Sequence, residues 1–275
     1  MDRRKRRLHR RVYEVPAPNY IWHIDTNHKL VRWKFVIAGG VDGFSRFVVY
    51  LKCIDNNRAI TLCGCFLEAV QKYGKPLNVR SDQGMENLEI AEYMLANGRN
   101  MVTGKSTHNQ RVERMWKDIY EGVLCSYYVV FYYMEDEGLL DPLNDCHIFS
   151  LHFVFMPNIN QKLSIWNEAW SNHRLRTVNS SPRRLFLAGA INADISNGQP
   201  TIASIENTFT TRHYNEMQNN QRPVFEQPSF EMSTRCRQEL EQVQQESELD
   251  FLNPQSGIPI FNRVLEIVTR HRNSV

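Results

Sequence analysis

Three acidic residues of this sequence stand where carboxylates could act together. Asp25 and Asp82 each lie at the end of an apolar run typical of a strand, and Glu113 lies one turn into a run typical of a helix. Carboxylates are costly to gather unless a cation lies between them, and their hard oxygen ligands suit Mg²⁺ or Mn²⁺. We therefore expect Asp25, Asp82 and Glu113 to be catalytic and to bind two such ions, a site suited to phosphodiester chemistry. Any one of them alone would be an ordinary exposed acid.

The surrounding pattern predicts the elements that position these acids. Runs of β-branched and aromatic residues indicate strands. The first three strands are expected to form an antiparallel meander, and the later strands alternate with helices. This order favours an α/β domain with a mixed five-stranded sheet flanked by helices. If strands one and four are neighbours, Asp25 and Asp82 emerge at the same edge. The predicted strands are Ile21–Thr26, Trp33–Gly40, Phe44–Ile54, Leu77–Asp82 and Met101–Thr103, and the predicted helices are Asn57–Tyr73, Leu88–Ala96 and a long one from Asn109.

The sequence divides into three parts. A basic arm occupies residues 1–14, and the core with a helical extension occupies residues 15–190, where Pro182 suits a helix start. Residues 191–275 contain no lysine, eleven acids and seven arginines, and are rich in Asn, Gln and Ser. We expect this polar, acidic tail to be poorly ordered and largely disordered, with residues 235–250 able to form a polar helix and Ile258–Val268 a short amphipathic one.

Charge and cysteine content indicate the compartment and the partner. Residues 1–11 carry seven Lys or Arg against one acid, a block typical of an arm that binds phosphate or a nuclear import receptor. A solubilising tail is the alternative. The six cysteines show no zinc-site spacing and are interpreted as reduced thiols. The most apolar stretch, Val123–Met134, is too short to span a bilayer, so no membrane partner is expected. DNA is the expected partner and the nucleus the expected location, with the cytoplasm as a second one.

Several ordered blocks resemble the catalytic core of the integrase and transposase superfamily, whose signature is two aspartates and a glutamate. The resemblance covers roughly residues 15–190. The amino-acid sequence of these blocks is similar to that of integrase-core proteins that persist in animal genomes as relics of mobile DNA. The blocks are Trp22-His23-Ile24-Asp25, Val41-Asp42-Gly43-Phe44-Ser45-Arg46, Tyr73-Gly74-Lys75-Pro76 through Ser81-Asp82-Gln83-Gly84, Asn109-Gln110-Arg111-Val112-Glu113-Arg114, and Asn172-His173-Arg174-Leu175-Arg176 with Ser181-Pro182.

The resemblance implies an RNase H-like fold, a DDE metal triad and polynucleotidyl transfer, that is, DNA cleavage and integration. Members act as multimers, so it also admits a homo-oligomer. It places Asn109 and Gln110 where the family contacts DNA ends, although Asn109 could equally cap the helix. Lys117, one turn after Glu113, and Arg114 are expected to contact DNA phosphate, against the alternative of solvated surface cations.

Two neighbouring acids are left outside the site. Asp42 is expected to cap the Gly-rich turn, and Glu86 could be a supporting acid near Asp82. His108 is interpreted as a loop histidine.

Two other functions stay open. A domesticated or decayed integrase core could bind DNA or a protein without catalysis, which the absence of recognisable flanking DNA-binding modules favours. An RNase H-type nuclease acting on RNA would need an extra acid on the first helix, for which Glu68 is the candidate.

Overall fold

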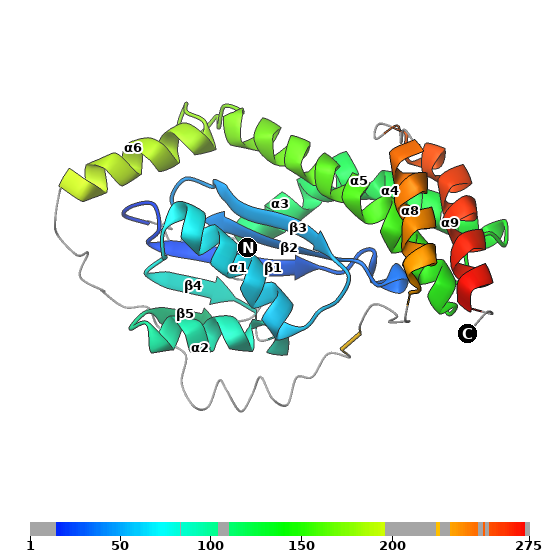
Figure 1. Ribbon diagram of the computed structural model, residues 1–275. Helices are drawn as coiled ribbons and strands as arrows, with labels where there is room; N and C mark the ends of the chain where they lie inside the picture. The colour runs from blue at the N-terminus through cyan, green and yellow to red at the C-terminus, as the bar shows by residue number, and fades with distance from the viewer. Residues whose placement is uncertain are drawn as a thin grey trace, which may run out of the picture.

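The computed structural model describes residues 15–82, 84–103, 110–195, 224–225, 232–246, 250 and 253–272. Its centre is a five-stranded sheet in the order β3-β2-β1-β4-β5. β1, β2 and β3 pair antiparallel, whereas β4 and β5 join them in parallel, so the predicted mixed sheet is confirmed (Figure 1). The strands are β1 (Ile21–Asn27), β2 (Val36–Asp42), β3 (Val48–Ile54), β4 (Asn78–Ser81) and β5 (Asn100–Thr103).

The loop between β1 and β2 shows one difference from the sequence prediction. Trp33 was expected to start the second strand, but it ends a short 3₁₀ turn, Val31–Trp33. Lys34 follows with a φ of 58°, a left-handed conformation that breaks an extended chain. Trp33 is instead fully buried, and its indole nitrogen donates to Oε1 of Glu135 at 2.6 Å. The strand therefore begins only at Val36.

The turn between β2 and β3 is built on Asp42, as the sequence predicted. Its Oδ2 accepts hydrogen bonds from the backbone N–H of Ser45 at 2.8 Å and from the Ser45 hydroxyl at 2.6 Å, and Oδ1 accepts one from the N–H of Asn19. Asp42 is fully buried, and this burial raises the pKa of its carboxyl group. Asp42 therefore holds the turn and does not face a metal site.

Helices cover both faces of the sheet (Figure 1). One core lies between the sheet and α1 (Ala59–Tyr73) and α2 (Leu88–Ala96), and it includes Trp22 and Ile24 of β1. The other lies against the face that carries Ile37 and Val41 of β2. Since successive residues of a strand face opposite sides, His23 and Asp25 face this second group of helices.

The second face is covered by a nearly continuous helical extension, which agrees with the prediction. It consists of α3 (Gln110–Ile119), one wider π-helical turn (Tyr120–Leu124), α4 (Cys125–Asp136) and the long α5 (Asp145–Asn172), with α6 (Pro182–Ile195) beyond it. Within the described residues, none of the helices is both long enough and apolar enough to cross a membrane.

Within the tail that the sequence predicted to be poorly ordered, the structure describes residues 191–195, 224–225, 232–246, 250 and 253–272. Two stretches are helical, α8 (Thr234–Glu246) and α9 (Gly257–Arg272), at the positions where the sequence admitted helices. α9 packs on α5, and α8 packs on α9. Their buried side chains join the core of the α3–α5 face, namely Cys236, Leu240, Val243, Phe261, Val264, Ile267 and Val268. Burial of these apolar stripes stabilises both helices in spite of their polar composition.

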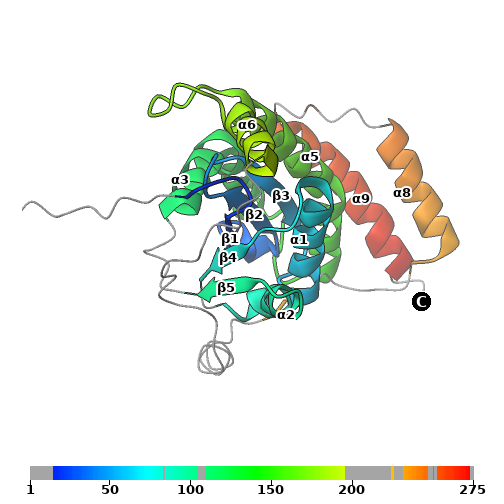
Figure 2. The same cartoon turned by 90° about the vertical axis from the view of Figure 1, so that its left-hand side faces the viewer.

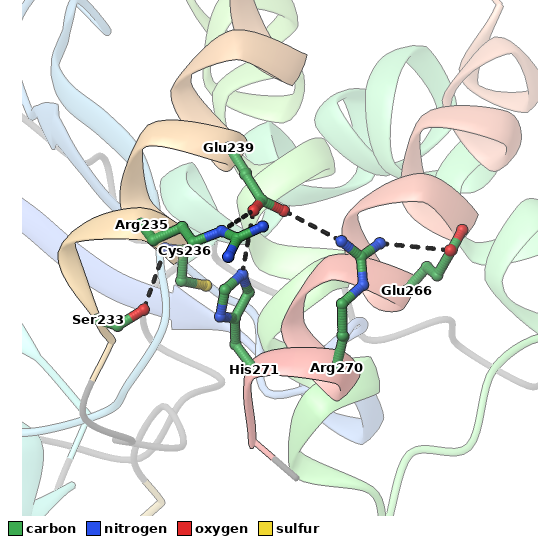
Figure 3. Close-up of polar contacts among 7 residues, drawn as sticks. All are labelled: Ser233, Arg235, Cys236, Glu239, Glu266, Arg270 and His271. Atoms are coloured by element: carbon green, nitrogen blue, oxygen red, sulfur yellow. Dashed lines mark hydrogen bonds and ion pairs between the residues drawn. The ribbon is translucent and has the colours of Figure 1, made fainter. Parts of the chain in front are cut away.

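A polar cluster joins α8 to α9 (Figure 3). Glu239 of α8 lies 3.0 Å from Arg235, 3.3 Å from Arg270 and 3.4 Å from His271. Partial desolvation opposes ionisation of Glu239, but its contacts with Arg235 and His271 lower its pKa overall. The cluster fixes how the two helices face each other.

Candidate active site

Asp25 lies on β1, and Asp82 directly follows β4, the parallel neighbour of β1 in the sheet. β1 and β4 run in parallel with Ile21 opposite Asn78, Trp22 opposite Val79 and His23 opposite Arg80. The pairing ends there, and the same register continued by two residues would set Asp25 opposite Asp82 at an inter-strand spacing of roughly 4.8 Å. Both residues are half-buried. The sequence analysis expected both carboxylates at one edge if the first and fourth strands are neighbours, and β1 and β4 are neighbours in the sheet.

The carboxylate of Asp25 is held by protein hydrogen-bond donors. Its Oδ1 accepts from the backbone N–H of Thr26 at 2.9 Å, and its Oδ2 accepts from the indole N–H of Trp116 at 2.9 Å. Trp116 belongs to α3 and is nearly fully buried. The contact fixes the orientation of the carboxylate and ties α3 to β1.

Gly39 makes room for this contact. It pairs with Asp25 across β1 and β2, and a Cβ at this position would lie 2.8 Å from Cη2 of Trp116 and 3.1 Å from Cε of Met115. A larger residue at 39 would push the indole ring away. A glycine inside a strand often marks such a close approach, so the Gly39-Gly40 pair was a signal in the sequence for a side chain packed here.

Asp82 is held by the segment that follows β4. Its Oδ1 lies 3.3 Å from the backbone nitrogen of Gly84 and 3.3 Å from the side-chain amide of Asn87, and both donate to it. Glu86 is buried beside them, and a Cβ at Gly84 would lie 2.5 Å from its carboxyl carbon, so a larger residue at 84 would displace the Glu86 side chain. Asn87 and Trp116 are the supporting residues that sequence reasoning missed.

Glu113 lies on α3 three residues before Trp116, so it shares that side of the helix. Its side chain is exposed. Within the part of the chain that the structure describes, no three acidic, histidine or cysteine side chains gather closely enough to hold a metal ion. The structure thus brings Asp25 and Asp82 together but does not bring Glu113 into a common ligand set with them. The triad stays a prediction.

Residues 12–199 match the sequence profile of the integrase core domain. The chain belongs to this family. No curated protein matches it. Among solved structures, this integrase core is similar to the catalytic core domain of the HTLV-2 integrase in complex with magnesium, at 19% identity over 62% of this chain and 97% of that chain. The TM-score is 0.44 for the trimeric form and 0.42 for the dimeric form.

A third similar structure is the intasome of simian T-cell lymphotropic virus in complex with the PP2A regulatory subunit B56 gamma. Its identity is 17%, the TM-score is 0.46, and the match covers 71% of this chain and 60% of that chain. The mixed sheet flanked by helices is the RNase H-like fold of integrase cores.

The residues of this integrase core fit a divalent metal in part. A carboxylate on β1 and another directly after the neighbouring β4 offer the hard oxygen donors that Mg²⁺ or Mn²⁺ prefers. Asp25 and Asp82, with Glu113 as the predicted third ligand, are the residues that would hold the ion. Trp116 and Asn87 already orient the two aspartates by hydrogen bonds.

The predicted DNA contacts lie on or before α3. Lys117 is exposed and lies 3.8 Å from Glu121, and Arg114 is exposed and lies 3.3 Å from Asp118, so each cation has an acidic neighbour one turn later. Such exposed pairs contribute little free energy, and phosphate can displace them. Asn109 and His108 lie outside the described residues, as does the side chain of Gln110.

Glu68, the candidate extra acid of an RNase H-type nuclease, lies on α1. This helix packs on the face that carries Trp22 and Ile24, opposite to Asp25. Its side chain is exposed and lies 3.3 Å from Lys52. Glu68 is therefore not part of the Asp25–Asp82 site.

Proposed function

We propose that this integrase core binds DNA and catalyses metal-dependent phosphodiester cleavage and strand transfer. The observation that supports the proposal is the parallel pairing of β1, which carries Asp25, with β4, which leads directly into Asp82, in a chain of the integrase core family. Two fixed, neighbouring carboxylates are costly to maintain without a cation, and their orienting donors indicate a built site rather than two surface acids.

The residues of the chain would divide the work as follows. Asp25 and Asp82, with Glu113, would bind Mg²⁺ or Mn²⁺, and such ions would supply the Lewis acidity that activates a water or a 3′-hydroxyl and stabilises the leaving oxygen. Trp116 and Asn87 keep the aspartates oriented. Lys117 and Arg114, on the exposed side of α3, would bind the flanking phosphates, together with Asn109 and Gln110 before and at the start of this helix.

The test is an assay of labelled duplex DNA with purified protein and Mn²⁺. We expect nicking or joining by the wild type and its loss in Asp25→Asn, Asp82→Asn and Glu113→Gln. Glu92→Gln is the matched control, because Glu92 is an exposed acid on α2. Loss of activity in the Glu92 variant as well would mean that the assay reports folding, not the site.

A second candidate is a non-catalytic core that binds DNA or a protein. It is favoured by the exposure of Glu113 and by the absence, among the described residues, of a three-ligand metal group. A wild type that binds DNA but is as inactive in Mn²⁺ as Asp25→Asn and Asp82→Asn would support this candidate and contradict catalysis.

The proposal includes an origin in mobile DNA, a nuclear location and assembly as a homo-oligomer. Support for the location comes from the DNA substrate and from the basic block at residues 1–11. A fluorescent fusion should concentrate in the nucleus and lose this distribution when residues 1–11 are deleted. Light scattering on the purified protein should give a mass that is a multiple of 32.3 kDa.

A further inference from the structure

The chain between Glu168 and Asp194 has an unusual charge pattern. It contains four arginines and no aspartate or glutamate. The segment includes the end of α5, the connecting loop of residues 173–181 and most of α6. In a sequence with nearly equal numbers of acids and bases, such an acid-free basic stretch marks a surface that does not repel anions.

The loop has a defined conformation. Leu175 pairs with Ser180 in an isolated bridge, the backbone nitrogen of Asn179 donates to the carbonyl of Leu175 at 2.8 Å, and Asn179 adopts a φ of 55°. Leu175 is buried, whereas Arg174 and Arg176 on either side of it are exposed. The buried leucine therefore holds both arginines at the surface.

Aromatic rings and one ion pair fix the base of this loop. Trp170 stacks on Trp166 at a centroid distance of 5.4 Å and contacts the ring of His173 at 4.5 Å. The indole nitrogen of Trp170 donates to the carbonyl of Arg46, in the turn between β2 and β3, at 3.0 Å. Arg183 makes a two-point contact with Glu168. These contacts connect the two ends of the loop to α5 and to the turn between β2 and β3.

Arg183 forms an ion pair with a carboxylate, but within the described ranges the other three arginines of the segment do not. Among the residues that the structure describes, no ion pair involves Arg174, Arg176 or Arg184. The planar guanidinium group of arginine matches phosphate oxygens with two parallel hydrogen bonds. Three such groups on exposed residues of this segment, without an ion-pair partner among the described residues, are suited to a chain of phosphates.

We propose that Arg174, Arg176 and Arg184 form a second nucleic-acid contact, which holds the phosphate backbone away from Asp25 and Asp82. The inference rests on the proposed function, because it assigns a further binding surface to the same DNA. In Figure 2 the loop between α5 and α6 projects on the side of the molecule where α3 lies. One DNA duplex could therefore contact the exposed side of α3 and this loop together.

The experiment measures binding of a fluorescein-labelled DNA duplex by anisotropy in EDTA, so that cleavage does not occur, over a series of KCl concentrations. We expect Arg174→Gln/Arg176→Gln to bind about tenfold more weakly and to lose nearly two units of salt slope, at about 0.9 per phosphate contact. Arg184→Gln alone should lose about one unit. The matched control is Arg237→Gln, an exposed arginine on α8, which should keep the wild-type slope.

Each outcome separates the two proposals. If Arg174→Gln/Arg176→Gln and Arg184→Gln both keep the wild-type salt slope, with normal DNA binding and cleavage, the second contact is overturned. The proposed function is then unaffected. This result would assign the arginines to another partner, such as an acidic protein. A wild type that does not bind DNA at all contradicts the proposed function itself. Equal losses in Arg237→Gln overturn the assignment to the loop.

Discussion

Trp116 and Asp25 are joined by a hydrogen bond of 2.9 Å between the indole nitrogen and Oδ2, across 91 residues of sequence. The indole group can only donate, so the carboxylate oxygen accepts. The bond links the helix that carries Glu113 to the strand that carries Asp25. Any movement of α3 therefore changes the orientation of the aspartate.

Replacing Trp116 by Phe removes the donor but keeps an aromatic ring. A hydrogen bond to a charged group contributes roughly 1.5–3 kcal/mol, so we expect Mn²⁺-dependent cleavage to fall about tenfold to a hundredfold. Calorimetric titration with Mn²⁺ should show weaker binding. The control is Trp33→Phe, which removes a similar indole–carboxylate bond whose acceptor is Glu135 of α4 and not Asp25. It should lower stability but leave Mn²⁺ affinity unchanged, whereas equal affinities in all three proteins would show that the donor at 116 is irrelevant.

Replacing Gly39 by Ala tests the space that Trp116 needs. The added Cβ would lie 2.8 Å from the indole ring, and relief of this overlap should cost about 1–3 kcal/mol of unfolding free energy. Gly64→Ala is the control, because nothing lies within 4 Å of a Cβ there and Gly64 is in the exposed part of α1. This second change should stabilise the protein by about 0.5–1 kcal/mol. Urea unfolding measures both, and a neutral Gly39→Ala would contradict the packing described.

His152 should make stability depend on pH. It is buried on α5, its Nε2 donates to the carbonyl of Trp33 at 2.8 Å, and burial lowers its pKa to about 4 from an ordinary value of 6.5. Between pH 6.5 and pH 4 the His152 imidazole binds a proton in the unfolded chain but stays neutral in the folded protein. The free energy of unfolding therefore keeps its full value above pH 6.5 and decreases as the pH falls toward 4. The loss should reach roughly 3 kcal/mol.

Urea unfolding between pH 7.5 and pH 4.5 measures this effect, and His152→Gln should flatten the curve in that window. His173→Gln, a change at an exposed ring, should not. The same pH dependence in wild type and His152→Gln would assign the effect to other groups.

Phe261 tests whether α9 belongs to the core. Its side chain is fully buried, and it contacts the ring of His147 on α5 at a centroid distance of 6.2 Å. Phe261→Ala should cost about 3–5 kcal/mol in the free energy of unfolding. Leu187→Ala, on the exposed side of α6, should change it by no more than about 0.5 kcal/mol. A small effect at Phe261 would favour the disordered tail that the composition suggested.

The sequence predicted the sheet well because its strands are short β-branched and aromatic runs. The condition under which Asp25 and Asp82 are expected at one edge is also met, since β1 and β4 are neighbours in the sheet. It missed Trp116 because a tryptophan in a helix usually signals the core, and its hydrogen bond depends on how α3 packs. Glu113 shows the same limit, since helix position alone does not set the direction of a side chain.

The docking of α8 could not be read from composition. Only Cys236, Leu240 and Val243 are buried on this helix, a narrow stripe in a sequence rich in Gln and Glu. A stripe of this width does not reveal whether a partner surface exists. That surface comes from α9 and α5, whose residues lie elsewhere in the chain.

The packing of α9 on α5 also sets an order of events during synthesis. α5 leaves the ribosome well before α9. The apolar face of α5 therefore stays uncovered until α9 and the segment between the two helices have been synthesised. Contacts between such distant segments form slowly because a long loop must first close. A translation pause between α6 and α8 should therefore leave α5 uncovered, and chaperones that bind apolar surface should act on the nascent chain at that stage.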